Sequence, residues 1–435
     1  MITPVPLVAW IAAAGFLLLS AGILARTLKT SAPPRRGLLI TLALGGAAVR
    51  VLLWWFSIGS NDTLIRRSHA LHILAGGLAN TYQSYQSFPQ FNHPPLIGLY
   101  AAQAWVSAGG NLLTFAHLVK LPGLAGEAIT MWALWRYASP TAFAVYAWLP
   151  GPILVSSFHG NDDCLYGALV LVAAIAFDKE NYFLSGFLWS AALDVKILPL
   201  ILIPLMLLGA PSWKALVRLA AGFAIGMTPF IPPALTAGTA MYQNMIVYNS
   251  RPENWGIIGL LRGIIALLDR SVSSPAAAGM ATAFGNWWLA EGRYVILLAI
   301  VVVAVLSKFH RKIPMTEQAA LGAALFLVLT PGFAVQYIAL VTPVLCLVDL
   351  KEGAWWGWTS GLFVGAVYCM FMVSWMPLQS TLQGFYPFPA NALGMMAWVV
   401  LAHFVSNHVC SAWKPLRDAE KRPLPRPYTE GRSVL

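Results

Sequence analysis

The chain has few charged residues and few cysteines. Asp, Glu, Lys and Arg together make up 10% of its 435 residues, whereas soluble domains contain about 25%. So little charge cannot cover a water-facing surface of this size. The four cysteines are scattered and form no Cys-x-x-Cys pair, so we interpret them as small apolar residues rather than metal ligands or a disulfide framework. The nucleotide-binding loop G-x-x-x-x-G-K-[ST] is also missing from the sequence, and neither an ATP-driven pump nor a cytosolic nucleotide-sugar enzyme is supported.

Apolar residues are abundant instead. They make up 58% of the chain, with 18 tryptophans and 14 tyrosines, and many runs approach the ~20 residues needed to cross a bilayer. The pattern predicts an all-α, polytopic integral membrane protein with about 13 transmembrane helices in one domain, residues 1–410. The predicted spans are 5–25, 37–57, 115–136, 140–158, 164–177, 182–195, 197–210, 218–235, 294–308, 317–332, 335–350, 354–376 and 391–408.

Basic residues predict the orientation of these spans. The net charge of +11 is concentrated in blocks beside apolar runs, at 26–36, 308–312 and 411–435. We interpret the blocks as topology signals and contacts for anionic lipid rather than a nucleic-acid surface. The first span is followed, not preceded, by positive charge, which is the reverse of a signal peptide. The blocks, including the tail 411–435, are therefore expected in the cytoplasm and the N-terminus outside, provided that residues 96–111 do not cross the membrane.

Polar motifs fall on the other side of the same topology. They lie mainly in two predicted outer segments, 58–96 and 236–293, and at the ends of spans; the first segment is expected to contain a short interfacial helix. Only apolar runs and basic blocks entered the count, so the gathering of these motifs on one face indicates a single outward-facing site. The candidate residues are Asp62, Asn92, His93, His159, Asn161, Asp162, Asp163, Lys196, Arg251, Gln336 and Tyr337.

Five of these motifs occur in an order that carries a family resemblance. They are Asp62 after an early span, Tyr82 with FNHPPL at 91–96, HGNDD at 159–163, Lys-x-x-Pro at 196–199, and Thr330-Pro331-Gly332 leading to Gln336-Tyr337 and Pro343. The set, over roughly residues 50–345, resembles the GT-C superfamily of membrane glycosyltransferases. Within that superfamily it is most similar to the bacterial polyprenyl-phosphate-mannose-dependent mannosyltransferases.

The resemblance implies a sugar donor on a polyprenyl phosphate and an active site on the extracytoplasmic face of the inner (plasma) membrane. It implies Asp62 as the general base of an inverting transfer, most simply of mannose, to a lipid, glycan or protein acceptor. A positioned carboxylate can take the proton of the attacking hydroxyl. Cations must hold the phosphate leaving group, and we assign this to Lys196 and Arg251. The other candidates are expected to contact substrate.

Several residues keep a structural alternative. Asp62 is also a suitable helix N-cap, and Arg66 with Arg67 fits either lipid phosphates or the donor phosphate. Lys196 fits a snorkelling interfacial lysine, with Asp194 as its partner. His93 and His159 also fit hydrogen-bonded structural side chains.

Two further motifs leave more than one role open. The adjacent carboxylates Asp162 and Asp163 are suited to sugar hydroxyls, to a divalent ion (Mg²⁺ or Mn²⁺) or to capping the next helix. Gln336 and Tyr337 also fit an interfacial aromatic belt.

The competing class is transport, in the form of a flippase for a lipid-linked sugar or another permease. Transporters often contain internal repeats, and no repeat relates the two halves here. The charges also cluster toward one face, which favours an enzyme. Sugar identity, acceptor, metal requirement and oligomeric state stay open.

Overall fold

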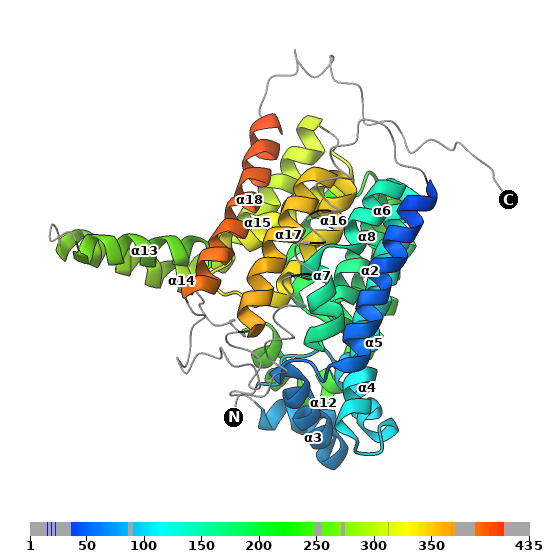
Figure 1. Ribbon diagram of the computed structural model, residues 1–435. Helices are drawn as coiled ribbons and strands as arrows, with labels where there is room; N and C mark the ends of the chain where they lie inside the picture. Colours follow the sequence, from blue (N-terminus) through cyan, green and yellow to red (C-terminus); the bar gives the residue numbers. More distant parts are fainter. Residues whose placement is uncertain are drawn as a thin grey trace.

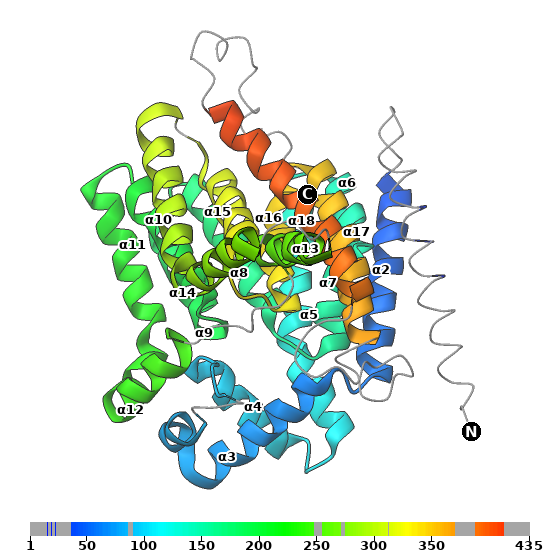
Figure 2. The same ribbon diagram turned by 90° about the vertical axis from the view of Figure 1, so that its left-hand side faces the viewer.

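The computed structural model describes residues 36–85, 90–247, 255–270, 275–311, 313–369 and 388–412, together with residues 15, 19 and 22. Every regular element within these ranges is a helix, and no strand occurs in them. The predicted all-α class is therefore confirmed. Figure 1 shows a bundle of helices with a smaller group of helices attached to its lower end, and Figure 2 shows the same arrangement from the side.

The elements follow one another with short connections. The first half of the chain contains α2 (Arg36–Phe56), α3 (Asn61–Ser84), α4 (Pro95–Ser107), α5 (Leu112–Tyr137), α6 (Pro140–Ala147), α7 (Pro150–Ile153), the π-helix η1 (Leu154–His159), α8 (Asp163–Asp178), α9 (Tyr182–Val195), the 3-10 helix η2 (Leu198–Leu202) and α10 (Ile203–Gly209). The second half contains α11 (Trp213–Gly226), η3 (Thr228–Phe230), α12 (Ile231–Met245), α13 (Gly256–Arg270), α14 (Pro275–Leu306), η4 (Ser307–Arg311), α15 (Met315–Leu329), η5 (Val335–Tyr337), α16 (Ile338–Val348), α17 (Leu350–Val367) and α18 (Phe388–Ala412).

Three helices, α3, α4 and α12, lie together at one end of the bundle, which we call the site end (Figures 1 and 2). A helix is present where a short interfacial helix was expected within 58–96; it is α3, which is longer than expected, with 24 residues and a kink at Gly77. Helix α4 covers most of the ambiguous segment 96–111 and has 13 residues. At 1.5 Å per residue it is about 20 Å long, shorter than the ~30 Å hydrocarbon core of a bilayer. Helix α4 is therefore too short to cross a membrane upright.

The bundle has a centre and a periphery that the sequence explains. Helices α15 and α16 are apolar on every side, and nearly all of their side chains are buried. Helices that are apolar all round belong in the interior. The outer helices α2 and α18 expose large apolar side chains, such as Leu44 at 65% and Val399 at 57%. Such exposure suits contact with lipid tails.

Four helical segments are long and apolar enough to cross a membrane: Arg36–Phe56, Leu112–Tyr137, Thr282–Phe309 and Pro389–Val409. The number is six if each of two bent helix pairs counts as one span. The chain thus has the helices of a membrane protein. Most other predicted spans correspond to helices of fewer than 18 residues, so the count of about 13 stays a prediction. Nearly all of span 5–25, all of 370–376 and nearly all of the basic tail 411–435 lie outside the described residues.

Two predicted spans are broken rather than continuous. The segment predicted at 140–158 forms α6 followed by α7 and η1, with a bend of 55°. Pro150 opens the second part, and proline has no N–H to continue the preceding helix. The segment predicted at 218–235 bends by 44° between α11 and the helix that continues to Met245. Pro229, Pro232 and Pro233 follow this break, so the same cause applies.

Candidate functional site

The turn between α2 and α3 brings Asp62 to the site end. Gly59 has a positive φ of 104°, which glycine adopts without strain. Ser60 is the N-cap of α3, and its Oγ accepts the N–H of Asp62 at 3.2 Å. Asp62 itself lies in the first turn of α3, where a negative charge is favourable. The predicted alternative role of Asp62 as the N-cap is therefore wrong, because Ser60 occupies that position.

A second segment, residues 154–163, contributes the other acidic groups. The helix after Pro150 widens into the π-helix η1, which ends at His159, and Gly160 follows with a φ of 84°. Single π-turns are frequent at functional sites. This left-handed turn ends the helix, and Asn161, Asp162 and Asp163 then lead into α8.

The two segments are joined through their backbones. The Ser60 N–H donates to the carbonyl oxygen of His159 at 3.1 Å, and the Ser60 hydroxyl donates to the same oxygen at 3.0 Å. A Cβ atom on Gly59 would lie 2.9 Å from the Phe158 carbonyl oxygen and 3.0 Å from that of His159. The close approach of these backbones therefore depends on glycine.

Four charged contacts fill the space between the segments and α9, and we call these residues the charge cluster. Arg66 Nη2 donates to Asn161 Oδ1 at 2.8 Å and to Asp162 Oδ1. Lys196 Nζ lies 3.3 Å from Asp163 Oδ1, and His159 Nε2 lies 3.0 Å from Asp62 Oδ2. The side chains of Asp162 and Asp163 have no exposed surface, whereas that of Asp62 is 25% exposed. Asp62 is thus the most accessible of the three carboxylates.

Electrostatics at the rim of the cluster keep Asp62 ionised and His93 neutral. Burial by itself would raise the pKa of Asp62, but His159, Arg66 and Lys196 together hold the pKa below its ordinary value. Burial lowers the pKa of His93 well below its usual range, and the charges of Arg66 and Lys196 act in the same direction. His93 is therefore an uncharged imidazole at neutral pH and cannot contribute a positive charge to an anion site.

A cavity of about 380 Å³ adjoins the cluster. Its walls are mostly apolar, from η2, α12, α14 and the end of α15, and the cations Lys196 and Arg293 face it. The polar residues Asn92, Thr330 and Tyr337 also line it. An apolar cavity with two cations at its wall suits a ligand that combines an anionic group with a hydrocarbon chain.

Helix α5 supports the cluster from behind. A Cβ atom on Gly123 would lie 2.7 Å from the Asn161 carbonyl oxygen, and one on Gly126 would lie 2.4 Å from the backbone of Cys164. Lys120, one turn before Gly123, donates from Nζ to the Ser57 carbonyl oxygen at 2.6 Å. Helix α5 therefore fixes both segments that carry the cluster.

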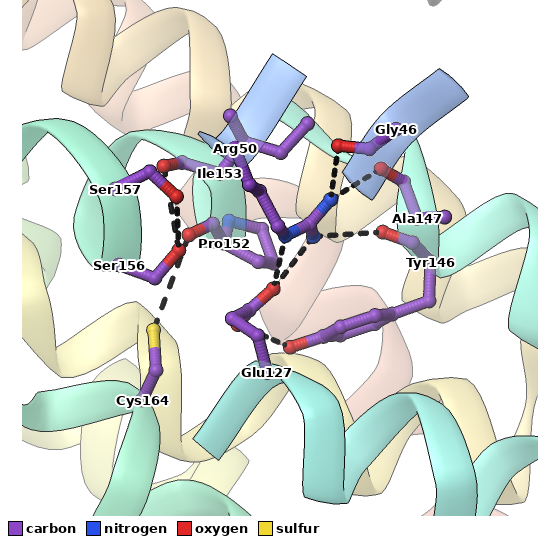
Figure 3. A network of polar contacts seen from close by, with 10 residues as sticks. All are labelled: Gly46, Arg50, Glu127, Tyr146, Ala147, Pro152, Ile153, Ser156, Ser157 and Cys164. Atoms are coloured by element: carbon purple, nitrogen blue, oxygen red, sulfur yellow. Dashed lines mark hydrogen bonds and ion pairs between the residues drawn. The ribbon is translucent and has the colours of Figure 1, made fainter. Parts of the chain in front are cut away.

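Figure 3 shows a buried polar network that fastens α5 in place. Arg50 of α2 donates through Nε and Nη2 to Glu127 Oε2 at 2.9 and 2.6 Å. Tyr146 of α6 donates its hydroxyl proton to Glu127 Oε1 at 2.8 Å. A buried ion pair is tolerated when its remaining hydrogen-bonding groups are satisfied. The network therefore connects α2 and α6 to α5 and fixes the position of α5 along these two helices.

The predicted residues reach this site to different degrees. Asp62, His159, Asn161, Asp162, Asp163 and Lys196 meet in the charge cluster, whereas Asn92 and Tyr337 line the adjoining cavity. His93 lies beside Arg66 in a small pocket, and Gln336 is half-buried on η5, next to Tyr337. Arg251 lies outside the described residues.

Two predicted contacts are wrong. The partner of Lys196 is Asp163 rather than Asp194, because residues two apart do not face each other at the end of a helix. Arg66 does not lie at the lipid surface, since its side chain is 4% exposed and pairs with Asp162. Arg67 is the outer of the two arginines, and its guanidinium carbon lies over the ring of Trp105, 5.3 Å from the ring centroid.

Sequence reasoning missed three contributors: Lys120, Arg293 and Tyr368. Lys120 and Arg293 are charged residues within apolar helices, and that pattern is itself a signal of function or pairing. Tyr368, whose ring stacks on that of His159, carries no sequence signal because it ends an ordinary apolar helix.

Among the described residues, no group of three His, Cys, Asp or Glu side chains could hold a metal ion. Asp162 and Asp163, the predicted candidates for a divalent ion, instead pair with Arg66 and Lys196. No protein-family model and no curated protein matches this chain.

Proposed function

We propose that the protein is a membrane glycosyltransferase that moves a sugar from a polyprenyl phosphate to an acceptor hydroxyl. The observation that carries the proposal is the environment of Asp62. Its carboxylate is partly exposed, is held ionised, and belongs to a cluster whose other two carboxylates are buried and paired with cations. One accessible carboxylate beside cations is the arrangement that a base-assisted displacement of a phosphate requires.

The donor would occupy the cavity of about 380 Å³. Its phosphate would lie against Lys196 and Arg293, and its prenyl chain along apolar wall residues such as Leu198 and Ile296. Arg251 was the predicted second phosphate ligand, and Arg293 has the advantage of a position in the cavity wall. Both cations would stabilise the charge that develops on the leaving phosphate.

The reaction balances with the groups of this site. The acceptor oxygen forms a bond to the anomeric carbon while the bond from that carbon to the phosphate oxygen breaks. The bonding electrons leave with the polyprenyl phosphate, and the hydroxyl proton passes to Asp62. The hydroxyl becomes acidic as its oxygen bonds to carbon, so a carboxylate of low pKa is a sufficient acceptor. Attack opposite the leaving group inverts the configuration.

The site would face the extracytoplasmic side of the inner membrane, since the basic blocks of the sequence are expected in the cytoplasm. Mannose is the sugar we propose first, and the acceptor would be a lipid, a glycan or a protein.

The test is transfer by purified protein in lipid nanodiscs. Polyprenyl-phosphate mannose, glucose and arabinose, each radiolabelled, are incubated with a membrane lipid extract, and products are separated by chromatography. We expect a labelled product with one donor in wild type and none with Asp62→Asn. A parallel assay in liposomes follows movement of the labelled donor between leaflets. Movement without any product would contradict the proposal and favour a flippase.

A further inference from the structure

We propose that His159 is a positioning residue: it donates Nε2–H to Oδ2 of Asp62 and so leaves Oδ1 of that carboxylate for the acceptor hydroxyl. The inference rests on the proposed function of Asp62 as base. It assigns to His159 a contact with the base rather than with substrate, and its evidence is the geometry around the imidazole.

The imidazole is stacked on its face and lies close to Asp62 at its edge. His159 Nε2 lies 3.0 Å from Asp62 Oδ2, and the His159 side chain has no exposed surface. Its ring stacks on Tyr368 with 5.0 Å between centroids and an interplanar angle of 5°. A fully buried ring stacked in this way has little freedom to rotate toward a substrate. The same burial fixes the orientation of the ring toward Asp62.

The backbone of His159 is fixed to the turn that carries Asp62. Two hydrogen bonds from Ser60, at 3.1 and 3.0 Å, end on the His159 carbonyl oxygen. The residues on both sides of this junction, Gly59 and Gly160, have positive φ values of 104° and 84°. Residues 60 and 159 thus make backbone and side-chain connections between the same two segments, and both connections set the position of Asp62.

Asp62 differs from the other two carboxylates of the charge cluster in the side chain that it contacts. Arg66 contacts Asp162 and Lys196 contacts Asp163, both fully buried carboxylates. Asp62 receives the imidazole instead. The partner of Asp62 is thus a buried ring stacked on Tyr368, whose direction is fixed, and this ring fixes the direction of the carboxylate that it contacts.

The first experiment examines the contact without any activity measurement. Protein labelled with ¹⁵N-histidine is studied by NMR, and His159→Phe identifies the His159 signals. We expect His159 to carry a proton on Nε2, and we expect its ¹⁵N shifts to change in Asp62→Ala. An unprotonated Nε2, with the proton on Nδ1, would overturn the inference. Unchanged ¹⁵N chemical shifts of His159 in Asp62→Ala would overturn it as well.

The second experiment uses two substitutions that separate ring from donor. His159→Phe keeps a ring to stack on Tyr368 but has no N–H, and His159→Gln keeps an N–H donor at similar reach but has no ring. We expect His159→Phe to lower kcat at least ~10-fold with donor KM within about 2-fold, since a misplaced reacting group costs up to about 100-fold. His159→Gln should recover part of this loss. His403→Phe is the matched control, because His403 is 62% exposed and pairs only loosely, at 3.4 Å, with Glu352.

The outcomes separate this inference from the proposed function. Equal losses in His159→Phe and His159→Gln would assign the effect to ring packing and overturn the positioning role. A raised donor KM with unchanged kcat would overturn it in favour of substrate contact. Absence of transfer by the wild type would overturn the proposed function, and the positioning role with it, whereas the NMR result would still report whether the contact exists.

Discussion

Three carboxylates of the charge cluster differ in what surrounds them. Asp162 and Asp163 have no exposed surface and contact Arg66 and Lys196. A buried charge is costly unless it is paired, and removing one partner of a buried pair typically costs 3–5 kcal/mol. These two residues therefore stabilise the site. Asp62 is 25% exposed, so its replacement costs less and tests chemistry rather than folding.

The first prediction concerns Asp62→Asn. Asparagine keeps the size and an acceptor oxygen near His159 Nε2, but it cannot take a proton. Capping is not affected, since Ser60 caps α3. We expect the variant to fold and bind donor normally while turnover falls at least ~10²-fold, the low end for a general base. Single-turnover transfer and donor binding measure the two effects. Glu180→Gln, which changes an exposed acid beside α8, is the control. Near-normal transfer by Asp62→Asn would contradict the role of Asp62 as the general base.

The second prediction is the pH dependence of stability at Asp62. Burial would raise its pKa, but His159, Arg66 and Lys196 outweigh burial and lower the pKa from 3.8. A lowered pKa contributes stability that is present above the unfolded value of about 3.9 and is lost as the pH falls through the folded value. The Tm advantage of wild type over Asp62→Asn should therefore be full at neutral pH and shrink below about pH 4. An advantage that grows in acid would contradict the assigned electrostatics.

The third prediction concerns Arg293, which is exposed to the cavity and has no ion pair with a carboxylate among the described residues. Replacing Arg293 therefore leaves no buried carboxylate of the charge cluster without its partner. Replacing Lys196 would remove the partner of the buried Asp163 carboxylate. We expect Arg293→Gln to raise donor KM about 10- to 100-fold at nearly constant Tm, because a charge-assisted contact contributes about 1.5–3 kcal/mol. Steady-state kinetics measure the donor KM, and Arg218→Gln, at an exposed arginine of α11 that does not line the cavity, is the control. Unchanged KM would remove Arg293 from the donor site.

At the scale of elements, α5 is the helix against which the site is built. One face of α5 contains Lys120, Gly123, Gly126 and Glu127, and these contact the turn after α2, the segment before α8 and the network of Figure 3. The glycines allow backbone-to-backbone contact, as small residues do between membrane helices. Any side chain added there pushes directly on residues 161–164.

The fourth prediction tests this contact with Gly126→Ala. The added Cβ would lie 2.4 Å from the Cys164 carbonyl carbon and oxygen, which are backbone atoms and cannot rotate away. We expect a loss of about 1–3 kcal/mol in the free energy of unfolding and a loss of turnover, because residues 161–163 shift. Gly263→Ala in α13 is the matched control, since its Cβ meets nothing within 4 Å. Equal Tm values for the two variants would contradict the close packing of α5.

The sequence predicted which segments meet but not how they meet. Apolar runs and basic blocks assigned Asp62, residues 159–163 and Lys196 to one face, and these residues do form one cluster. Individual partners depend on side-chain directions that spacing does not encode, so Asp163 rather than Asp194 contacts Lys196. Ser60 and Asp62 are both good capping residues, and only the helix start decides between them. The breaks at Pro150 and before Pro229 were visible as prolines, but their effect on a span was not predicted.

At the scale of the whole molecule, the two ends of the bundle differ in chemistry. The end opposite the cluster contains cations stacked on aromatic rings, with Arg36 over Trp135 at 5.0 Å and Arg136 over Tyr137 at 5.5 Å. Aromatic rings are enriched at both membrane interfaces, and Arg67 over Trp105 is a similar contact at the site end. The site end contains the polar cap of α3, α4 and α12 (Figure 1). Which of the two ends faces the cytoplasm is a prediction from the basic blocks of the sequence.

The last prediction tests that orientation by cysteine labelling in intact cells. All four native cysteines are first replaced by alanine, which removes the background. Gln83→Cys, exposed on α3, should then react with a membrane-impermeant thiol reagent added outside. Glu180→Cys, exposed between α8 and α9, should react only after the membrane is permeabilised. The physical reason is the positive-inside rule, which keeps Arg36, Arg136 and Lys179 on the cytoplasmic side together with Glu180. Labelling of position 180 but not position 83 in intact cells would reverse the topology and place the charge cluster in the cytoplasm, where a donor presented on the outer face could not reach it.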